Sequence, residues 1–138
     1  DVHSICPTHW AALPPVDVLA AGPPCQSFST AGSQQGWQSR NAAAFPATVS
    51  HIAHLMKQQP SHPLAYILEN VPAAATFDAI TSSLGQPIIA KAELHGSAAR
   101  RDTAFWTNVL ERSALQAAMD TPSQPEFTAA DCVRFFND

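Results

Sequence analysis

The chain has 138 residues, 46% hydrophobic and 13% charged, which is enough apolar material for one compact core and too little charge for a disordered tail. Its formal net charge of −4 excludes a module that binds nucleic acid through a strong overall positive charge, but it leaves room for a local basic groove. No run approaches the roughly 20 apolar residues of a membrane-spanning helix, and the first residues lack the pattern of a signal peptide. Because there is no initiator methionine, we expect a piece of a longer protein.

Cysteine usage indicates the compartment. Cys6, Cys25 and Cys132 are an odd number of cysteines without a paired spacing. This pattern favours reduced thiols over a disulfide framework. We therefore expect an intracellular protein, in the nucleus of a eukaryote or the cytoplasm of a bacterium.

The first predicted elements are a strand, a polar loop and a helix. Residues 16–21 form an apolar run that ends at Gly22, which is typical of a buried strand in a parallel sheet. Residues 26–41 are rich in Gln, Ser and Gly and predict a long loop. Residues 42–58 predict a helix, because apolar residues recur there at helical spacing. Its expected buried face consists of Val49, Ile52, Ala53 and Met56.

The rest of the chain continues the alternation of strands and helices. For the helix at 76–84, Thr76 is the expected N-cap and Gly85 follows the end. Alternating strands and helices predict an α/β fold with a parallel sheet, whose ligands bind beyond the carboxyl ends of the strands. The predicted elements after residue 60 are a strand at 65–68, the helix at 76–84, strands at 87–94 and 104–109, and a helix at 110–119.

Cys25 is the first candidate reactive residue. It lies in GPPCQSFS, directly after the first predicted strand. A free cysteine is often a buried structural residue. Two prolines and a preceding glycine nevertheless predict an abrupt turn at a strand end, and reactive thiols occupy partly exposed positions of this kind. The context therefore favours a nucleophile.

Charged residues occur at two further strand ends. Glu69 follows the strand at 65–68, and a carboxylate there is rarely placed for packing, although it could be a rim residue that caps a helix. Arg100 and Arg101 precede the strand at 104–109. They form either a solvated basic turn or a contact to an anion or a base.

The order and spacing of three segments, GPPCQSFS, ILENV and SAARRDTAFWTN, resemble the DNA (cytosine-5) methyltransferase family. The resemblance implies a partial Rossmann-like sheet with helices on both faces and one antiparallel strand near 104–109. It covers about residues 1–109, interpreted as a partial catalytic core. Residues 110–138 are then a helix and linker leading towards a missing recognition region. The third segment looks closest to the de novo branch of the family.

The resemblance also implies a chemistry for particular residues. Cys25 would attack C6 of a cytosine flipped out of DNA, and Glu69 would hydrogen-bond N3 and the exocyclic amine of that base. Asn70 would orient the Glu69 loop. Gln26 and Ser29 would lie near the DNA backbone or the space that the base vacates.

The methyl donor implied by the resemblance is S-adenosylmethionine. Asp1, Val2 and Pro24 match positions of the family at the cofactor. Arg101 matches the first arginine of a basic Arg-x-Arg motif and is the third expected catalytic residue, but Thr103 stands in place of the second. The family's glycine-rich cofactor loop is absent from the sequence, so we expect this chain alone to bind the cofactor poorly.

Other interpretations stay open. A catalytically dead methyltransferase-like binding module is one, and a methyltransferase acting on cytosine in transfer RNA is another. The weakest is an unrelated enzyme that pairs Cys25 with a histidine. His51 and His54 are three residues apart on the predicted helix, but no further ligands lie at a standard spacing, so we expect no metal site.

Overall fold

The structure is a computed structural model that describes residues 2–29, 32, 35–97 and 100–122. Asp1 and Cys132 lie outside the described residues. Strands and helices alternate as the sequence predicts. In chain order they are α1 (Pro7–Ala11), β1 (Val18–Ala21), α2 (Ala44–Gln58), β2 (Ala65–Asn70), α3 (Ala74–Leu84), β3 (Ile88–Lys91), β4 (Asp102–Thr107) and α4 (Arg112–Asp120), with short 3-10 helices at Val2–Ser4, Gly36–Gln38, Arg40–Ala43 and Ala92–His95.

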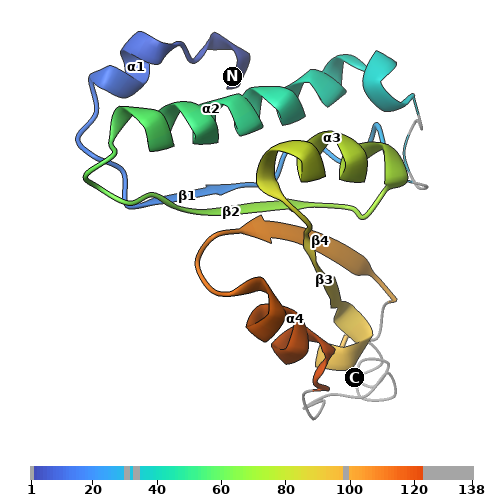
Figure 1. Ribbon diagram of the computed structural model, residues 1–138. Helices are drawn as coiled ribbons and strands as arrows, with labels where there is room; N and C mark the ends of the chain where they lie inside the picture. Colours follow the sequence, from blue (N-terminus) through green and yellow to red (C-terminus); the bar gives the residue numbers. More distant parts are fainter. Residues whose placement is uncertain (1, 30–31, 33–34, 98–99, 123–138) are drawn as a thin grey trace, which may run out of the picture.

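The four strands form one mixed sheet in the order β1-β2-β4-β3. β1 is parallel to β2, with Val18 opposite Ala65, whereas β4 runs antiparallel to both β2 and β3. β4 is therefore the single antiparallel strand of the described sheet, where one was expected. Figure 1 shows α1, α2 and α3 on one side of the sheet and α4 on the other. The prediction of an α/β fold with helices on both faces is confirmed.

The expectation that β1 is fully buried is wrong for the described part of the chain. Its side chains alternate between exposed and half-buried, and Val18 is 60% exposed. Among the described strands, β1 lies at the edge of the sheet and pairs with β2 alone. Val18 also lies on the face turned away from α2, as does its neighbour Ile67, which is 40% exposed.

The expected buried face of α2 is confirmed at Ile52 and at Val49, which packs against the core, and is wrong at Ala53 and Met56, which are exposed. Phe45, Ile52 and Leu55 are buried, whereas Met56 is 48% exposed. The expected and the observed buried residues both have helical spacing. Compared with the expectation, α2 is rotated about its axis so that the larger Phe45 and Leu55 face the sheet. α3 starts earlier than expected, with Ala73 at its N-cap, so Thr76 lies inside the helix.

One hydrophobic core lies between the sheet and the helices α2 and α3. At its centre Trp106 of β4 packs edge-on against Phe45, with ring centroids 6.2 Å apart. Tyr66 and Leu68 of β2 complete this layer. Fully burying a large apolar side chain stabilises a fold by about 1.5–3 kcal/mol. The core therefore holds β2 and β4, whose adjacent ends carry the candidate site.

The outer edge of β3 is covered by α4. The Gln116 side chain accepts a hydrogen bond from the N–H of Ile89 (2.9 Å) and donates one to its carbonyl (3.1 Å). An amide side chain thus replaces a neighbouring strand, which keeps this edge from pairing with other chains.

Candidate active site

The turn after β1 places Cys25 beyond the carboxyl end of that strand. The Cys25 carbonyl accepts hydrogen bonds from the N–H groups of Phe28 (2.9 Å) and Ser29 (2.8 Å). These bonds close a tight turn on the residue itself. Cys25 is a free, half-buried thiol. This is the partly exposed turn that the sequence predicts for it.

A buried hydrogen bond joins this turn to the end of β2. The Asn70 side chain is fully buried, and its Nδ2 donates to the Pro23 carbonyl over 3.0 Å. Its Oδ1 accepts from the N–H of Val71 over 2.8 Å. Both halves of the amide are therefore used, and the segments GPPCQ and ILENV meet at one edge of the sheet.

Glu69 lies on the opposite face of β2 from Asn70, beside the same turn. A Cβ atom on Gly22 would lie 3.2 Å from Glu69 Oε2, so the carboxylate rests against the glycine backbone. Arg101 Nη2 lies 4.0 Å from Glu69 Oε1, with the two side chains 64% and 36% exposed. The three residues expected to be catalytic are thus only partly brought together. Glu69 lies beside Arg101 and beside the turn that carries Cys25.

Thr103 shares a sheet face with Glu69. Phe105 pairs directly with Glu69 across the β2–β4 ladder, and residues two apart on a strand point the same way. Thr103 is therefore next to Glu69 on that face, and it is half-buried. Its hydroxyl occupies a position where the resemblance expects a guanidinium.

The loop after Cys25 folds back on the turn, which the sequence did not predict. The N–H of Gly36 donates to the Ser27 carbonyl over 2.8 Å. Phe28 meets Trp37 edge-on, with ring centroids 4.8 Å apart. Gly32 is so close to the Gln26 backbone that no Cβ could fit. The described residues of this loop thus pack against the Cys25 turn, and the sequence signal for this packing was the two glycines Gly32 and Gly36.

The remaining predicted contacts are near the surface. Gln26 is exposed and Ser29 is half-buried, next to Cys25. Pro24 is exposed beside the thiol, and Val2 is half-buried in the 3-10 helix Val2–Ser4.

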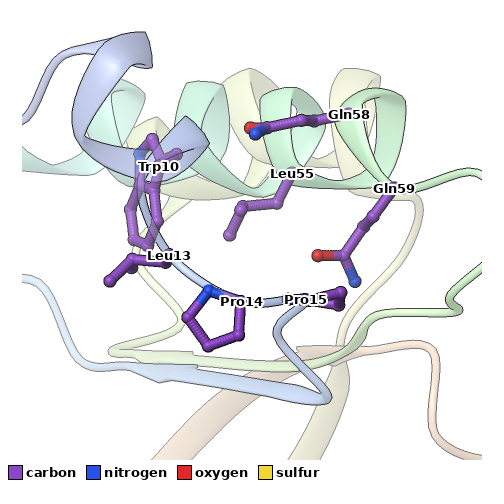
Figure 2. Close-up of a pocket in the computed structure, with 7 residues that line it drawn as sticks. All are labelled: Trp10, Leu13, Pro14, Pro15, Leu55, Gln58 and Gln59. Atoms are coloured by element: carbon purple, nitrogen blue, oxygen red, sulfur yellow. The ribbon is translucent and has the colours of Figure 1, made fainter.

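A small pocket of about 110 Å³ lies at the other end of the sheet. Figure 2 shows its lining side chains between α1, the segment before β1 and the end of α2. The lining residues come just before β1 and β2 in the chain, at the ends where these strands begin. Cys25 and Glu69 lie where the same two strands end, so the pocket is separate from the candidate site. The lining residues are Trp10, Leu13, Pro14, Pro15, Leu55, Gln58 and Gln59.

His51 and His54 lie on α2 as predicted. His51 accepts a hydrogen bond from the Trp10 indole over 3.0 Å. Within the described residues, no three His, Cys, Asp or Glu side chains gather as metal ligands. In that same part of the chain, no helix combines the length and apolar character needed to cross a bilayer.

Comparisons with known proteins identify methyltransferases that are similar in sequence to part of this chain. The curated relatives include the type II methyltransferase M.NgoBI of Neisseria gonorrhoeae, 36% identical over 78 residues, which are 56% of this chain and 22% of that protein. M.BanI of Aneurinibacillus aneurinilyticus is 35% identical over 78 residues, 56% of this chain and 16% of that protein. M.NlaIV of Neisseria lactamica is 36% identical over 66 residues, 48% of this chain and 14% of that protein. The aligned part of the chain thus spans less than a quarter of each.

The family match covers the Cys25 turn, β2 and α3. The profile of the C-5 cytosine-specific DNA methylase family matches residues 1–84, which include Cys25 and Glu69. Residues 97–109, with the basic segment, lie beyond it. The match covers more than half of the 138 residues, and the chain belongs to the C-5 cytosine-specific DNA methylase family.

Proposed function

We propose that this chain carries catalytic residues of a DNA cytosine-5 methyltransferase, Cys25 as nucleophile and Glu69 and Arg101 as its partners. The observation that supports it best is the Asn70–Pro23 hydrogen bond. It fixes the nucleophile turn against the strand that carries Glu69. In parallel α/β sheets, this edge beyond the strand ends is where ligands bind.

The proposed reaction makes a weakly nucleophilic ring carbon reactive. The Cys25 thiolate adds to C6 of cytosine, forming a C–S bond and moving electron density towards C5. Glu69 hydrogen-bonds N3 and the exocyclic amine, which disperses the charge that develops in the ring. After methylation, C5 loses its proton and the C–S bond breaks, so the aromatic ring and the thiolate are both restored. The target base must leave the duplex to reach Cys25.

Arg101 and the polar residues of the turn are assigned to the nucleic acid. Arg101 is 64% exposed, and its Nη2 lies 4.0 Å from Glu69. It can therefore reach towards a base or a phosphate while it stays near the carboxylate. Gln26 and Ser29 would contact the DNA backbone or fill the gap in the duplex, and Asn70 would hold the Glu69 segment in place.

Two described residues, Val2 and Pro24, match cofactor positions of the family that the sequence resembles. Pro24 exposes its ring beside Cys25, and the Val2 carbonyl is held by a hydrogen bond to His51 Nε2 over 3.1 Å. We assign Val2 and Pro24, with Asp1, to contacts with S-adenosylmethionine. When bound, that cofactor supplies the methyl group. The aligned part of the chain spans under a quarter of each relative's length, so we assign the activity to the whole protein, with residues 1–109 as part of its core and 110–138 as a connection to another region.

Thr103 favours a second candidate function, a methyltransferase-like module that binds nucleic acid without modifying it. Its side chain lies on the sheet face of Glu69, where a second arginine is expected. If the missing guanidinium is essential, DNA binding persists and methylation does not.

Covalent trapping distinguishes the candidates. The full-length protein is incubated with S-adenosylmethionine and DNA containing 5-fluorocytosine, whose fluorine cannot leave as a proton, so the adduct persists. We expect a DNA adduct that disappears in Cys25→Ser and persists in the matched control Cys6→Ser. An adduct with Cys25→Ser would refute the assigned nucleophile. DNA binding without an adduct would favour the binding module, and an adduct with fluorinated transfer RNA alone would assign the substrate to RNA.

A further inference from the structure

A hydrogen-bonded chain connects α1, α2 and the first residues of the structure. The Trp10 indole N–H donates to His51 Nδ1 over 3.0 Å. On the other side of the imidazole, His51 Nε2 lies 3.1 Å from the Val2 carbonyl. The Trp10 and His51 rings are in contact, with centroids 5.5 Å apart and planes at 59°. One histidine of α2 thus bonds two residues that are eight positions apart in the N-terminal segment.

The two partners define the state of the imidazole. An indole nitrogen only donates and a carbonyl only accepts. Nδ1 of His51 must therefore be unprotonated, and Nε2 must carry the hydrogen. His51 thus accepts a hydrogen bond on one side of its ring and donates one on the other.

The N-terminal segment is also held where it meets β1, since the Gln59 side chain accepts a hydrogen bond from the N–H of Val16 over 3.0 Å and donates one to its carbonyl over 2.7 Å. α1 has only five residues, and none of them is buried. Trp10 is half-buried against the core, and Val2 is half-buried in its 3-10 helix. The bridge through His51 ties the Val2 backbone directly to α2.

We propose that His51 is a positioning residue for the cofactor contact assigned to Val2, because it fixes the Val2 carbonyl and the backbone around it. This inference rests on the proposed function, which assigns Val2 to the cofactor. His51 touches neither the base nor Cys25 in that assignment. Its loss therefore weakens cofactor binding and leaves the chemical step unchanged.

The test measures cofactor binding and kinetics in the full-length protein. Binding of S-adenosylhomocysteine, the demethylated product of the cofactor, is followed by calorimetry, and kcat and KM are measured with S-adenosylmethionine. We expect His51→Ala to raise Kd and KM about tenfold, the typical effect of one lost hydrogen bond, with kcat within about twofold of the wild type. His54→Ala, on the same helix, is the matched control and leaves all three values unchanged.

Two conservative variants separate the two hydrogen bonds. The Gln amide nitrogen in His51→Gln reaches the Nε2 position and can still donate to Val2, so this variant keeps most of the affinity. The shorter Asn in His51→Asn can accept from Trp10 but does not reach Val2, so it behaves like His51→Ala. The thermal midpoint of each variant is measured in parallel, so that the rescue by Gln is judged among variants that fold.

Specific outcomes overturn the inference. If the wild type binds the cofactor and His51→Ala binds it equally well, His51 has no positioning role, while the proposed function stands. Equal affinities for the Gln and Asn variants, or a fall in kcat that matches the rise in KM, would also refute it. A wild-type protein without cofactor binding would refute the proposed function and this inference together.

Discussion

Asn70 donates a hydrogen bond from its fully buried side chain to the carbonyl of Pro23, two residues before Cys25. The contact joins segments that are 47 positions apart in the sequence. Because Glu69 immediately precedes Asn70, the bond couples the positions of the proposed nucleophile and of the carboxylate proposed to bind the base. A shift of β2 would move both ends of the site.

Asn70→Ala is expected to weaken both the fold and the site. It leaves the buried Pro23 carbonyl without its donor, which costs about 1–3 kcal/mol in the free energy of unfolding. Trapping on 5-fluorocytosine DNA is expected to slow in the same variant. Urea unfolding and single-turnover trapping measure the two effects. Asn41→Ala, at an exposed position, is the control, and equal stability of the two variants would contradict the role of this bond.

Arg101→Ala is expected to separate activity from stability. The pair with Glu69 is exposed and its closest atoms are 4.0 Å apart, so its loss costs less than about 1 kcal/mol of stability. If Arg101 faces the developing charge, methylation falls by roughly 10²-fold. Arg100→Ala changes a neighbouring exposed arginine and is expected to keep full activity. A larger loss in Arg100→Ala would mean that the basic motif is shifted by one residue.

The order of the elements could be predicted because each signal is local. Apolar runs marked the strands, the first of which ends at Gly22, and helical spacing marked α2. The burial of β1 could not be predicted, since its apolar run does not reveal that Val18 lies on an outer strand with an uncovered face. The rotation of α2 was missed for a similar reason, because two rows of apolar residues compete for the same core.

The candidate site could be predicted only as positions along the chain. Cys25 and Glu69 were placed at strand ends from sequence alone, and their assigned chemistry stays a prediction. The contacts that hold them are long-range and have no local pattern. Trp10 had no assignment, and His51 was considered only for a metal site. Their bond spans 41 positions, so only the folded chain reveals it.

Gly22→Ala tests the close approach of the carboxylate. The new methyl group would lie 3.2 Å from Glu69 Oε2, so the carboxylate must move by a few tenths of an ångström. Since a misplacement of about 1 Å can cost 10²-fold in rate, we expect a three- to tenfold slower trapping reaction and a nearly unchanged thermal midpoint. An unchanged rate would show that the exact position of the Glu69 carboxylate does not limit the reaction.

Cys6 is expected to react as an unusually acidic thiol. The Thr8 hydroxyl, 2.9 Å from Cys6 Sγ, and the backbone N–H of His9 hydrogen-bond to the sulfur and lower the pKa of Cys6 below its usual value. A lower pKa means that more of the thiol is present as thiolate at neutral pH. The alkylation rate of Cys6 therefore rises at a lower pH than that of a cysteine with an ordinary pKa. Peptide mass spectrometry after iodoacetamide treatment measures this profile.

Thr8→Ala removes the larger cause of the lowered pKa of Cys6. The alkylation profile of Cys6 is then expected to move to higher pH, so that its rate at pH 7 falls. Thr8→Ser keeps a hydroxyl at this position and is expected to keep the profile of the wild type. Identical profiles for the Ala and Ser variants would contradict the assigned cause.

Ser27→Ala is expected to stabilise the protein or to leave its stability unchanged. The Ser27 hydroxyl is buried, and no described residue forms a hydrogen bond with it. A buried hydroxyl without a partner costs about 1–3 kcal/mol, which its removal recovers. Thr48→Val is the comparison, because the buried Thr48 hydroxyl donates to the Ala44 carbonyl over 2.8 Å. Thermal unfolding of both variants measures the difference, and a loss of more than about 1 kcal/mol in Ser27→Ala would mean that its hydroxyl has a partner in solution.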